Sequence, residues 1–267
     1  MGHRKQGMIS VSEPKPSIRP SYRRAAIRDH IEKRGSATIE ELAQKFKSST
    51  ETVRRDLKVL ADAGQIRKIH GGACRIDVSE EGPFEARMGR NTLAKQAIAE
   101  KVRSLVAPGQ TLFIDTGSTT LICAKVLARI RKLRVVTNSV LIADVFAKGS
   151  GGADVTLLGG RFRSDNHQTV GAETVQEIRN FQLDHAILTV GAIDQDGLLD
   201  ISEEEAQVAR AMIRSARDLT VVADLSKLQA RGQYRLCGFE DVTNLVLDEA
   251  PNAAFAQRVA EAGVTLY

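Results

Sequence analysis

Short apolar runs of strand length alternate with longer amphipathic segments along the last two thirds of this 267-residue chain. Parallel strands need crossover connections, which are usually helices, so the alternation predicts a mainly parallel α/β sheet covered by helices over residues 92–267. The expected strands are Thr111–Ile114, Arg134–Thr137, Val155–Leu158, His185–Val190, Thr220–Ala223, Asn244–Leu247 and Val264–Tyr267. The expected helices are Thr92–Leu105, Ser118–Arg131, Ser139–Ala147, Ala172–Phe181, Glu203–Ala216 and Ala253–Ala262.

Residues 21–75 have a different pattern, which predicts three short helices followed by a β-hairpin. The expected elements are helices over residues 21–35, 39–46 and 50–63, and a hairpin with one strand at 65–69 that turns at Gly71-Gly72. Thr38 is the expected N-cap of the second helix. Two N-caps compete at the third helix, Ser48 with Glu51 and Ser49 with Thr52. Three helices and a hairpin predict a winged helix-turn-helix domain.

The first quarter of the chain is strongly basic. Residues 1–75 hold 17 Lys and Arg against 8 Asp and Glu, a net charge of +9, whereas the remainder carries −4. An apolar stripe along the third predicted helix leaves its cationic residues on other faces. Most charged clusters are solvated helix faces, but the helix-turn-helix spacing and the basic excess favour DNA binding here. The residues expected to contact DNA are Ser49, Thr50, Thr52, Arg54, Arg55 and Lys58 around this helix, and Lys68 and His70 on the wing.

The remaining segments limit the class of protein. Residues 1–20 are expected to be a disordered arm, and residues 76–91, which contain Gly82-Pro83, a linker. No stretch approaches the ~20 apolar residues of a membrane span, and no secretory signal is evident. The three cysteines lie far apart, the five histidines do not cluster, and no catalytic triad order is found. We therefore expect a cytoplasmic protein with no membrane, metal, cofactor or catalytic residues.

Polar residues follow several of the predicted strands. Ligands of open α/β sheets bind beyond the carboxyl ends of the strands, where loops meet helix N-termini. After the first strand, Asp115, Thr116, Gly117, Ser118 and Thr119 lead directly into a helix, which suits a phosphate cradle or, equally, an ordinary Ser/Thr helix cap. The other expected ligand residues are Asn138, Arg161, Asp194, Glu205 and Lys227. Cations and amides would hold a phosphate, and Asp194, Asn138 and Glu205 would hold hydroxyl groups, so we expect a small phosphorylated polyol.

Several motifs resemble those of the DeoR family of bacterial transcriptional repressors. In the first domain they are Glu41-Leu42-Ala43, the run from Ser49 to Leu57 and Ile69-His70-Gly71-Gly72-Ala73. In the second they are the run Asp115–Thr119, Thr137-Asn138-Ser139, Gly159-Gly160, Gly191-Ala192-Ile193-Asp194, Arg210-Ala211-Met212-Ile213 and Asp224-Leu225-Ser226-Lys227. Ser48 stands where the family usually has an apolar residue, and Ser118 stands where Thr is common.

The resemblance implies a winged helix-turn-helix that binds operator DNA and a sensor domain related in fold to ribose-5-phosphate isomerase. It further implies a sugar phosphate effector that releases the repressor from DNA. Within the family, Phe162-Arg163-Ser164 and Asp196-Gly197-Leu198-Leu199-Asp200 are among the segments most similar to the glycerol-3-phosphate repressor branch. Its effector would be glycerol 3-phosphate or a related phosphorylated sugar, and its target a carbohydrate or glycerol-phosphate catabolic operon.

The oligomeric state and two alternative functions also follow from the sequence. Helix-turn-helix proteins usually bind two half-sites as dimers, so a homodimer or homotetramer is expected. A sugar-phosphate isomerase-like enzyme is the alternative function, although it would need an acid/base pair that the sequence does not offer convincingly. A third possibility is a protein that binds nucleic acid without sequence preference through its basic first domain.

Overall fold

The structure, a computed structural model, describes residues 19–62, 65–69, 71–74 and 82–267. It divides into two compact units, Met1–Ile76 and Asp77–Tyr267. The arm expected over residues 1–20 lies almost entirely outside the described residues, and so does His70. No helix in the described ranges is long and apolar enough to cross a membrane.

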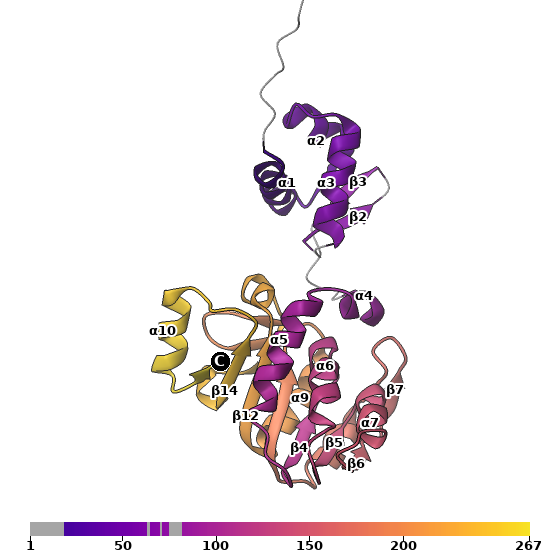
Figure 1. Cartoon of the computed structure of the whole chain (residues 1–267), viewed down its shortest axis with the longest axis vertical. Helices are drawn as coiled ribbons and strands as arrows, with labels where there is room; N and C mark the ends of the chain where they lie inside the picture. The colour runs from indigo at the N-terminus through magenta and orange to yellow at the C-terminus, as the bar shows by residue number, and fades with distance from the viewer. Residues whose placement is uncertain (1–18, 63–64, 70, 75–81) are drawn as a thin grey trace, which may run out of the picture. The chain divides into compact units, whose positions relative to one another are not determined.

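The first unit is a three-helix domain with a small antiparallel sheet (Figure 1). Its elements are α1 (Pro20–Arg34), β1 (Ser36–Thr38), α2 (Ile39–Lys45), α3 (Thr50–Asp62), β2 (Arg67–Ile69) and β3 (Gly72–Cys74). The sheet order is β1-β3-β2, so the hairpin gains a third strand that the sequence did not predict. At Gly72 a Cβ atom would lie 2.4 Å from the Ala37 carbonyl oxygen, and this close approach of β3 to β1 requires glycine.

The N-caps of α2 and α3 follow from their sequences. Thr38 Oγ1 accepts a hydrogen bond from the Glu41 backbone N–H (3.1 Å), and a Glu41 carboxylate oxygen accepts one from the Thr38 N–H (2.9 Å), which completes a capping box. Of the two competing caps for α3, Ser49 is the one formed, because its Oγ accepts from the Thr52 N–H at 3.2 Å. Ser48 Oγ instead donates to the Phe46 carbonyl (3.1 Å).

The second unit is built on a seven-stranded parallel sheet (Figure 1). In spatial order its strands are β15 (Thr265–Leu266), β14 (Asn244–Leu247), β12 (Ala216–Ala223), β9 (Leu183–Thr189), β4 (Thr111–Ile114), β5 (Arg134–Thr137) and β6 (Asp154–Leu157). All seven overlap strands expected from the apolar runs, and the prediction of a mainly parallel α/β sheet is confirmed.

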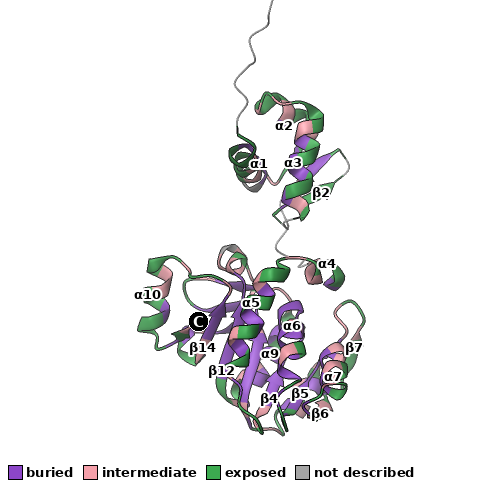
Figure 2. Cartoon of the chain, viewed as in Figure 1, coloured by how far each residue is buried: buried purple, intermediate pink, exposed green. Residues whose placement is uncertain are grey.

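Helices cover both faces of this sheet. They are α4 (Phe84–Met88), α5 (Thr92–Arg103), α6 (Ser118–Leu127), α7 (Val140–Ala147), α8 (Ala172–Ile178), α9 (Glu203–Arg214) and α10 (Ala253–Glu261). Successive residues of a strand point to opposite faces, so Phe113 packs in the cluster with α8, α9 and α10, while Leu112 and Ile114 pack in the cluster with α5, α6 and α7. The central strands β4, β5, β9, β12 and β14 are largely buried between the two layers, as Figure 2 shows, whereas the edge strands β6 and β15 are more exposed.

Two small antiparallel additions extend the strand ends. One is the hairpin β7 (Arg161–Arg163) and β8 (Gln168–Val170); the other pairs β10 (Ala192–Ile193), β11 (Leu198–Asp200) and β13 (Tyr234–Cys237). The short 3-10 helices η1 (Leu225–Gln229) and η2 (Phe239–Asp241) complete the unit. The sequence did not predict these additions, and they supply residues to the site described below.

The boundary expected at residue 91 needs correction. The segment predicted as a linker over residues 76–91 contains helix α4, and its Phe84 is buried in the core of the second unit at 4% exposure. Burying one large aromatic ring fixes this short segment on the domain. The second unit therefore begins before α4 rather than at Thr92.

Candidate functional site

The cationic face of α3 is exposed as the apolar stripe predicts. Val53, Leu57 and Leu60 are buried, while the side chains of Arg54 and Arg55 are 57% and 79% exposed. Both guanidinium groups lie near the Glu51 carboxylate, Arg54 at 3.7 Å and Arg55 at 3.5 Å. Ion pairs this exposed contribute little to stability, so both arginines can exchange Glu51 for a phosphate or a base.

The other residues expected to contact DNA also lie at the surface of the first unit. Ser49, Thr50 and Lys58 are exposed, Thr52 is half-buried, and Lys68 is exposed on β2. The orientation of α3 depends on a buried ion pair that sequence reasoning missed: Arg23 of α1 donates to the Asp56 carboxylate of α3 at 2.5 Å, and both side chains are under 10% exposed. The pair holds α1 against the buried side of α3, opposite its cationic face.

In the second unit, a small cavity of about 20 Å³ lies at the carboxyl ends of the strands. It brings together four of the residues expected to bind a ligand: Asp115 and Thr116 after β4, Asn138 after β5, and Glu205 in the first turn of α9. It is completed by Gln168, Thr189, Val190, Gly191, Asp200, Val208 and Ala209. The carboxyl-end rule for parallel sheets predicts that these residues lie near one another, and the sheet places them around this one cavity.

A chain of hydrogen bonds links the polar side chains of this cavity. Thr116 Oγ1 donates to Asn138 Oδ1 (3.3 Å), and Asn138 Nδ2 donates to Gln168 Oε1 (3.3 Å). Gln168 Nε2 in turn donates to Glu205 Oε1 at 2.8 Å. Each amide donates through nitrogen and accepts through oxygen, so one arrangement satisfies every link.

Asp115 is buried in the wall of the cavity. Its two carboxyl oxygens accept from the Thr189 backbone N–H at 3.1 and 3.0 Å. Burial raises the pKa of Asp115 well above its usual value, and the nearby carboxylates of Asp200 and Glu205 raise it further. A neutral Asp115 carboxyl would repel an anion much less than a carboxylate.

Helix α6 begins next to Asp115. A Cβ atom at its N-cap, Gly117, would lie 2.4 Å from the Thr189 side chain, so the close approach of β9 requires glycine there. Ser118 and Thr119 are buried in the first turn, at 7% and 5% exposure, and neither lines the cavity. Gly117 has no side chain that could cap the backbone N–H groups of this turn. These N–H groups and the helix dipole therefore favour the binding of an anion.

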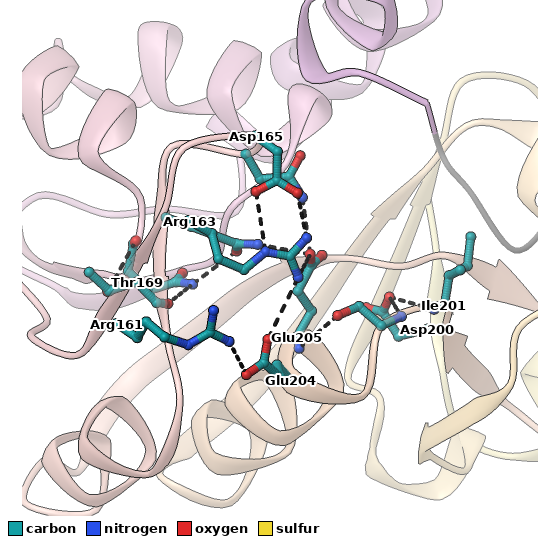
Figure 3. A network of polar contacts seen from close by, with 12 residues as sticks. Arg161, Arg163, Asp165, Thr169, Asp200, Ile201, Glu204 and Glu205 are labelled. Carbon is teal, nitrogen blue, oxygen red and sulfur yellow. Dashed lines mark hydrogen bonds and ion pairs between the residues drawn. The ribbon is translucent and has the colours of Figure 1, made fainter.

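A larger cleft of about 640 Å³ lies beside the cavity and shares Asp200 and Glu205 with it. Its walls come from three segments: the start of α4, the β7–β8 loop and the β11–α9 connection. Arg163 lines the cleft, lies 3.8 Å from both Glu204 and Glu205, and also pairs with Asp165 (Figure 3). The cleft therefore combines carboxylates that accept from hydroxyl groups with an arginine that can bind an anion.

Six of the residues expected to bind a ligand line neither the cavity nor the cleft: Gly117, Ser118 and Thr119 at the start of α6, and Arg161, Asp194 and Lys227. Arg161 is exposed and pairs with Glu204 at the surface (Figure 3). Asp194 accepts two hydrogen bonds of 2.8 Å from Arg235, which hold the pKa of this carboxyl below its usual value. Lys227 is half-buried in η1 and lines neither space. Within the part of the chain that is described, no three His, Cys, Asp or Glu side chains are grouped as metal ligands.

Sequence reasoning missed Gln168, Asp200 and Arg163 as site residues. Gln168 and Asp200 lie in the short strands β8 and β11, which were not predicted. Asp200 was noted only as the last residue of the segment Asp196-Gly197-Leu198-Leu199-Asp200, for its family resemblance, whereas Gln168 lies in no such segment. Arg163 was noted in the same way, two positions from the Arg161 that was chosen.

A helix-turn-helix unit with an exposed cationic helix, followed by a parallel α/β unit with a polar cavity at its strand ends, defines a ligand-sensing DNA-binding regulator. The profile of the DeoR-like helix-turn-helix domain matches residues 23–79, and that of the DeoR C terminal sensor domain matches residues 90–249. The chain belongs to the DeoR family of transcriptional regulators.

Curated proteins similar to this chain include repressors of transcription. The HTH-type transcriptional repressor CsqR of Escherichia coli is 35% identical over 88% of this chain and 90% of its own length. The glycerol-3-phosphate regulon repressor of Haemophilus influenzae is 37% identical over 88% of this chain and 91% of its own length. The chain is therefore a DeoR-family DNA-binding repressor with a sensor domain, and these relatives are described as repressors rather than as isomerases or other enzymes.

Among solved structures, ribose 5-phosphate isomerase from Plasmodium falciparum aligns with 52% of this chain and 53% of its own, at 18% identity and a TM-score of 0.38.

Proposed function

We propose that this repressor binds an operator through α3 and the wing, and that a phosphorylated sugar or polyol bound at the strand ends of the second unit releases it. The observation that carries the proposal is the convergence of Asp115, Thr116, Asn138 and Glu205 on one cavity. Asp115 and Thr116 are adjacent in the sequence, but Asn138 and Glu205 are each more than twenty positions from any other member of the set. The parallel sheet brings them together.

The charges of the site favour a particular orientation of the effector. Asp200 and Glu205 lie where the cavity meets the cleft, and carboxylates there suit hydroxyl groups and repel phosphate. The phosphate would sit at the other end, against Thr116 and the first turn of α6, where the buried Asp115 carries a raised pKa. The cavity alone is too small for such a molecule, so the effector would extend into the cleft.

Relatives support the chemical class of the effector. Proteins described as glycerol-3-phosphate regulon repressors in Haemophilus influenzae and Escherichia coli are 37% and 31% identical to this chain. Glycerol 3-phosphate is therefore the first compound to test, and the controlled operon is expected to serve carbohydrate or glycerol-phosphate catabolism. A regulator of this kind acts on DNA in the cytoplasm.

Ligand-induced thermal stabilisation of the full chain tests the site. We expect glycerol 3-phosphate or ribose 5-phosphate to stabilise the second unit by about 2.7 kcal/mol at a hundredfold excess over Kd, and inorganic phosphate or glycerol to do much less. Thr116→Val keeps the side-chain volume but removes the hydroxyl, and it should abolish the response. Thr265→Val, at the opposite edge of the sheet, is the control. Stabilisation that survives in Thr116→Val would refute this placement.

Release is tested with DNA. A duplex selected from a random library by the full chain serves as the operator probe. Saturating effector should weaken its binding by about 5–150-fold, a typical coupling between two sites. Unchanged affinity in the presence of a compound that stabilises the protein would contradict release.

We further propose a homodimer or homotetramer, because paired half-sites require two reading helices. Sedimentation of the full chain at micromolar concentration would contradict this if it gave the mass of one 29.0 kDa chain.

A further inference from the structure

The hydrogen-bond chain of the cavity continues beyond Glu205 to helix α4. The same Glu205 Oε1 that accepts from Gln168 also accepts from Asn166 Nδ2, at 3.0 Å. Asn166 Oδ1 then accepts from the Arg87 guanidinium of α4, at 2.5 Å. An unbroken path of side chains therefore runs from Thr116 at the start of α6 to Arg87.

Helix α4 lies at the start of the second unit. It begins ten positions after β3, the last strand of the DNA-binding unit, and it is the first element of the second unit. Helix α4 is therefore the first described element that follows the DNA-binding unit along the chain. Residues of α4 also wall the ligand cleft, Glu85 and Arg87 among them.

Helix α4 contacts the β7–β8 loop, which lines the cleft. Phe84 packs edge-to-face on His167, with ring centroids 6.0 Å apart, and Arg87 lies over the Phe84 ring at 5.4 Å. The Lys95 ammonium of α5 donates to the Arg87 carbonyl oxygen at 2.5 Å. Helix α4 has only five residues, so its position depends on these contacts rather than on its own stability.

On the basis of the proposed function, we propose that Arg87 and Asn166 are positioning residues that couple effector binding to DNA binding. The shared acceptor, Glu205 Oε1, is the point where the effector acts. A ligand hydroxyl that donates to Glu205, or a ligand that draws Arg163 away from it, changes the bond to Asn166 and so the hold of Asn166 on Arg87. The effector then alters the position of α4, the first described element after the DNA-binding unit.

The test measures coupling rather than either affinity alone. For the full chain, the Kd of the selected duplex is determined with no effector and with saturating glycerol 3-phosphate, and effector binding is followed separately by thermal stabilisation. Because Arg87 also lines the cleft, the effector concentration is raised for Arg87→Ala until the variant is fully stabilised. At that concentration the factor by which effector weakens DNA binding should fall to within about twofold of 1. Arg87→Lys keeps a donor and should restore part of the factor. Arg90→Ala, just beyond α4, is the matched control and should keep the wild-type factor.

Asn166→Ala should lose coupling to the same extent as Arg87→Ala, and the double variant should lose no more, because both residues lie on one path. Wild-type coupling in Arg87→Ala, or loss of effector stabilisation in that variant, would overturn the inference; the second result would make Arg87 a ligand contact. A wild-type protein that no phosphorylated polyol stabilises would instead show that the proposed function itself has failed.

Discussion

At the scale of single residues, Arg55 is the most exposed of the charged side chains measured on α3, at 79%. Arginine binds the edge of guanine through two hydrogen bonds, and the loss of a good contact of this kind costs about 1–3 kcal/mol. We expect Arg55→Ala to weaken binding of the selected duplex by that amount at fixed salt concentration, as measured by fluorescence anisotropy. Unchanged affinity would remove Arg55 from the interface.

Comparison with a random duplex separates two kinds of contact. If Arg55 contacts a base edge, Arg55→Ala weakens binding of the selected duplex more than that of the random one. If Arg55 contacts a phosphate, both duplexes bind more weakly to Arg55→Ala. The slope of the logarithm of the binding constant against the logarithm of the salt concentration then becomes shallower by about 1.

A second residue-scale prediction concerns Asp115. Because its pKa is raised in the folded protein, the folded state retains this proton when the unfolded state has already lost it. The free energy of unfolding therefore falls as pH rises from about 4 through the raised pKa, with a slope of at most about 1.4 kcal/mol per pH unit. Asp115→Asn cannot ionise, so its stability relative to wild type should grow with pH over that range. Urea unfolding at several pH values measures the free energy of unfolding of both proteins. If the two free energies changed with pH in parallel, the raised pKa of Asp115 would be contradicted.

At the scale of elements, the attachment of α1 to α3 depends on Arg23 and Asp56. Removing one member of a buried ion pair typically costs about 3–5 kcal/mol, because the other charge stays buried. We expect Asp56→Ala to destabilise the first unit by this amount and to abolish DNA binding, with the effector response of the second unit retained. Arg24 lies 3.9 Å from Asp56 with a third of its side chain exposed, so Arg24→Ala should cost no more than about 1 kcal/mol. Equal losses in the two variants would contradict this account.

The elements also show what the sequence could predict. The strands β4, β5 and β14 were predicted with the bounds that the structure has, since each is a run of apolar residues covered on both faces. Strands of three residues, such as β8 and β11, are too short for a periodic pattern. They form by pairing, β8 with its hairpin partner β7, and β11 with the nearby β10 and the distant β13.

The same contrast explains the predicted site. Asp115 and Asn138 directly follow long, predictable strands, so the carboxyl-end rule placed them together. Gln168 was missed because β8 was missed. Arg161 and Asp194 lie close to the strand ends along the chain, but their side chains pair with Glu204 and Arg235 outside the cavity. Direction and reach of a side chain are tertiary properties that spacing in the sequence does not encode.

At the scale of the whole molecule, the two units have separate cores. Ile27, Leu42 and Leu57 belong to a cluster confined to the first unit, and the two clusters of the second unit lie on opposite faces of its sheet. Charge is divided in the same way, with +9 on residues 1–75 and −4 on the rest. We therefore expect the first unit to bind DNA, and the second unit to bind a small ligand by local geometry despite its net negative charge.

This division predicts how the molecule responds to salt. Each phosphate neutralised by Lys or Arg releases a counterion, so a protein with about 6–10 phosphate contacts binds DNA roughly 10³–10⁵-fold more weakly at 200 mM than at 50 mM salt. We expect the full chain to show this dependence for both selected and random duplexes. The separately expressed second unit, residues 77–267, should bind neither duplex at any of these salt concentrations but should keep its stabilisation by the effector. DNA affinity in that fragment would contradict the division of function, because its net charge repels DNA and its arginines at the cleft, such as Arg163, lie beside carboxylates.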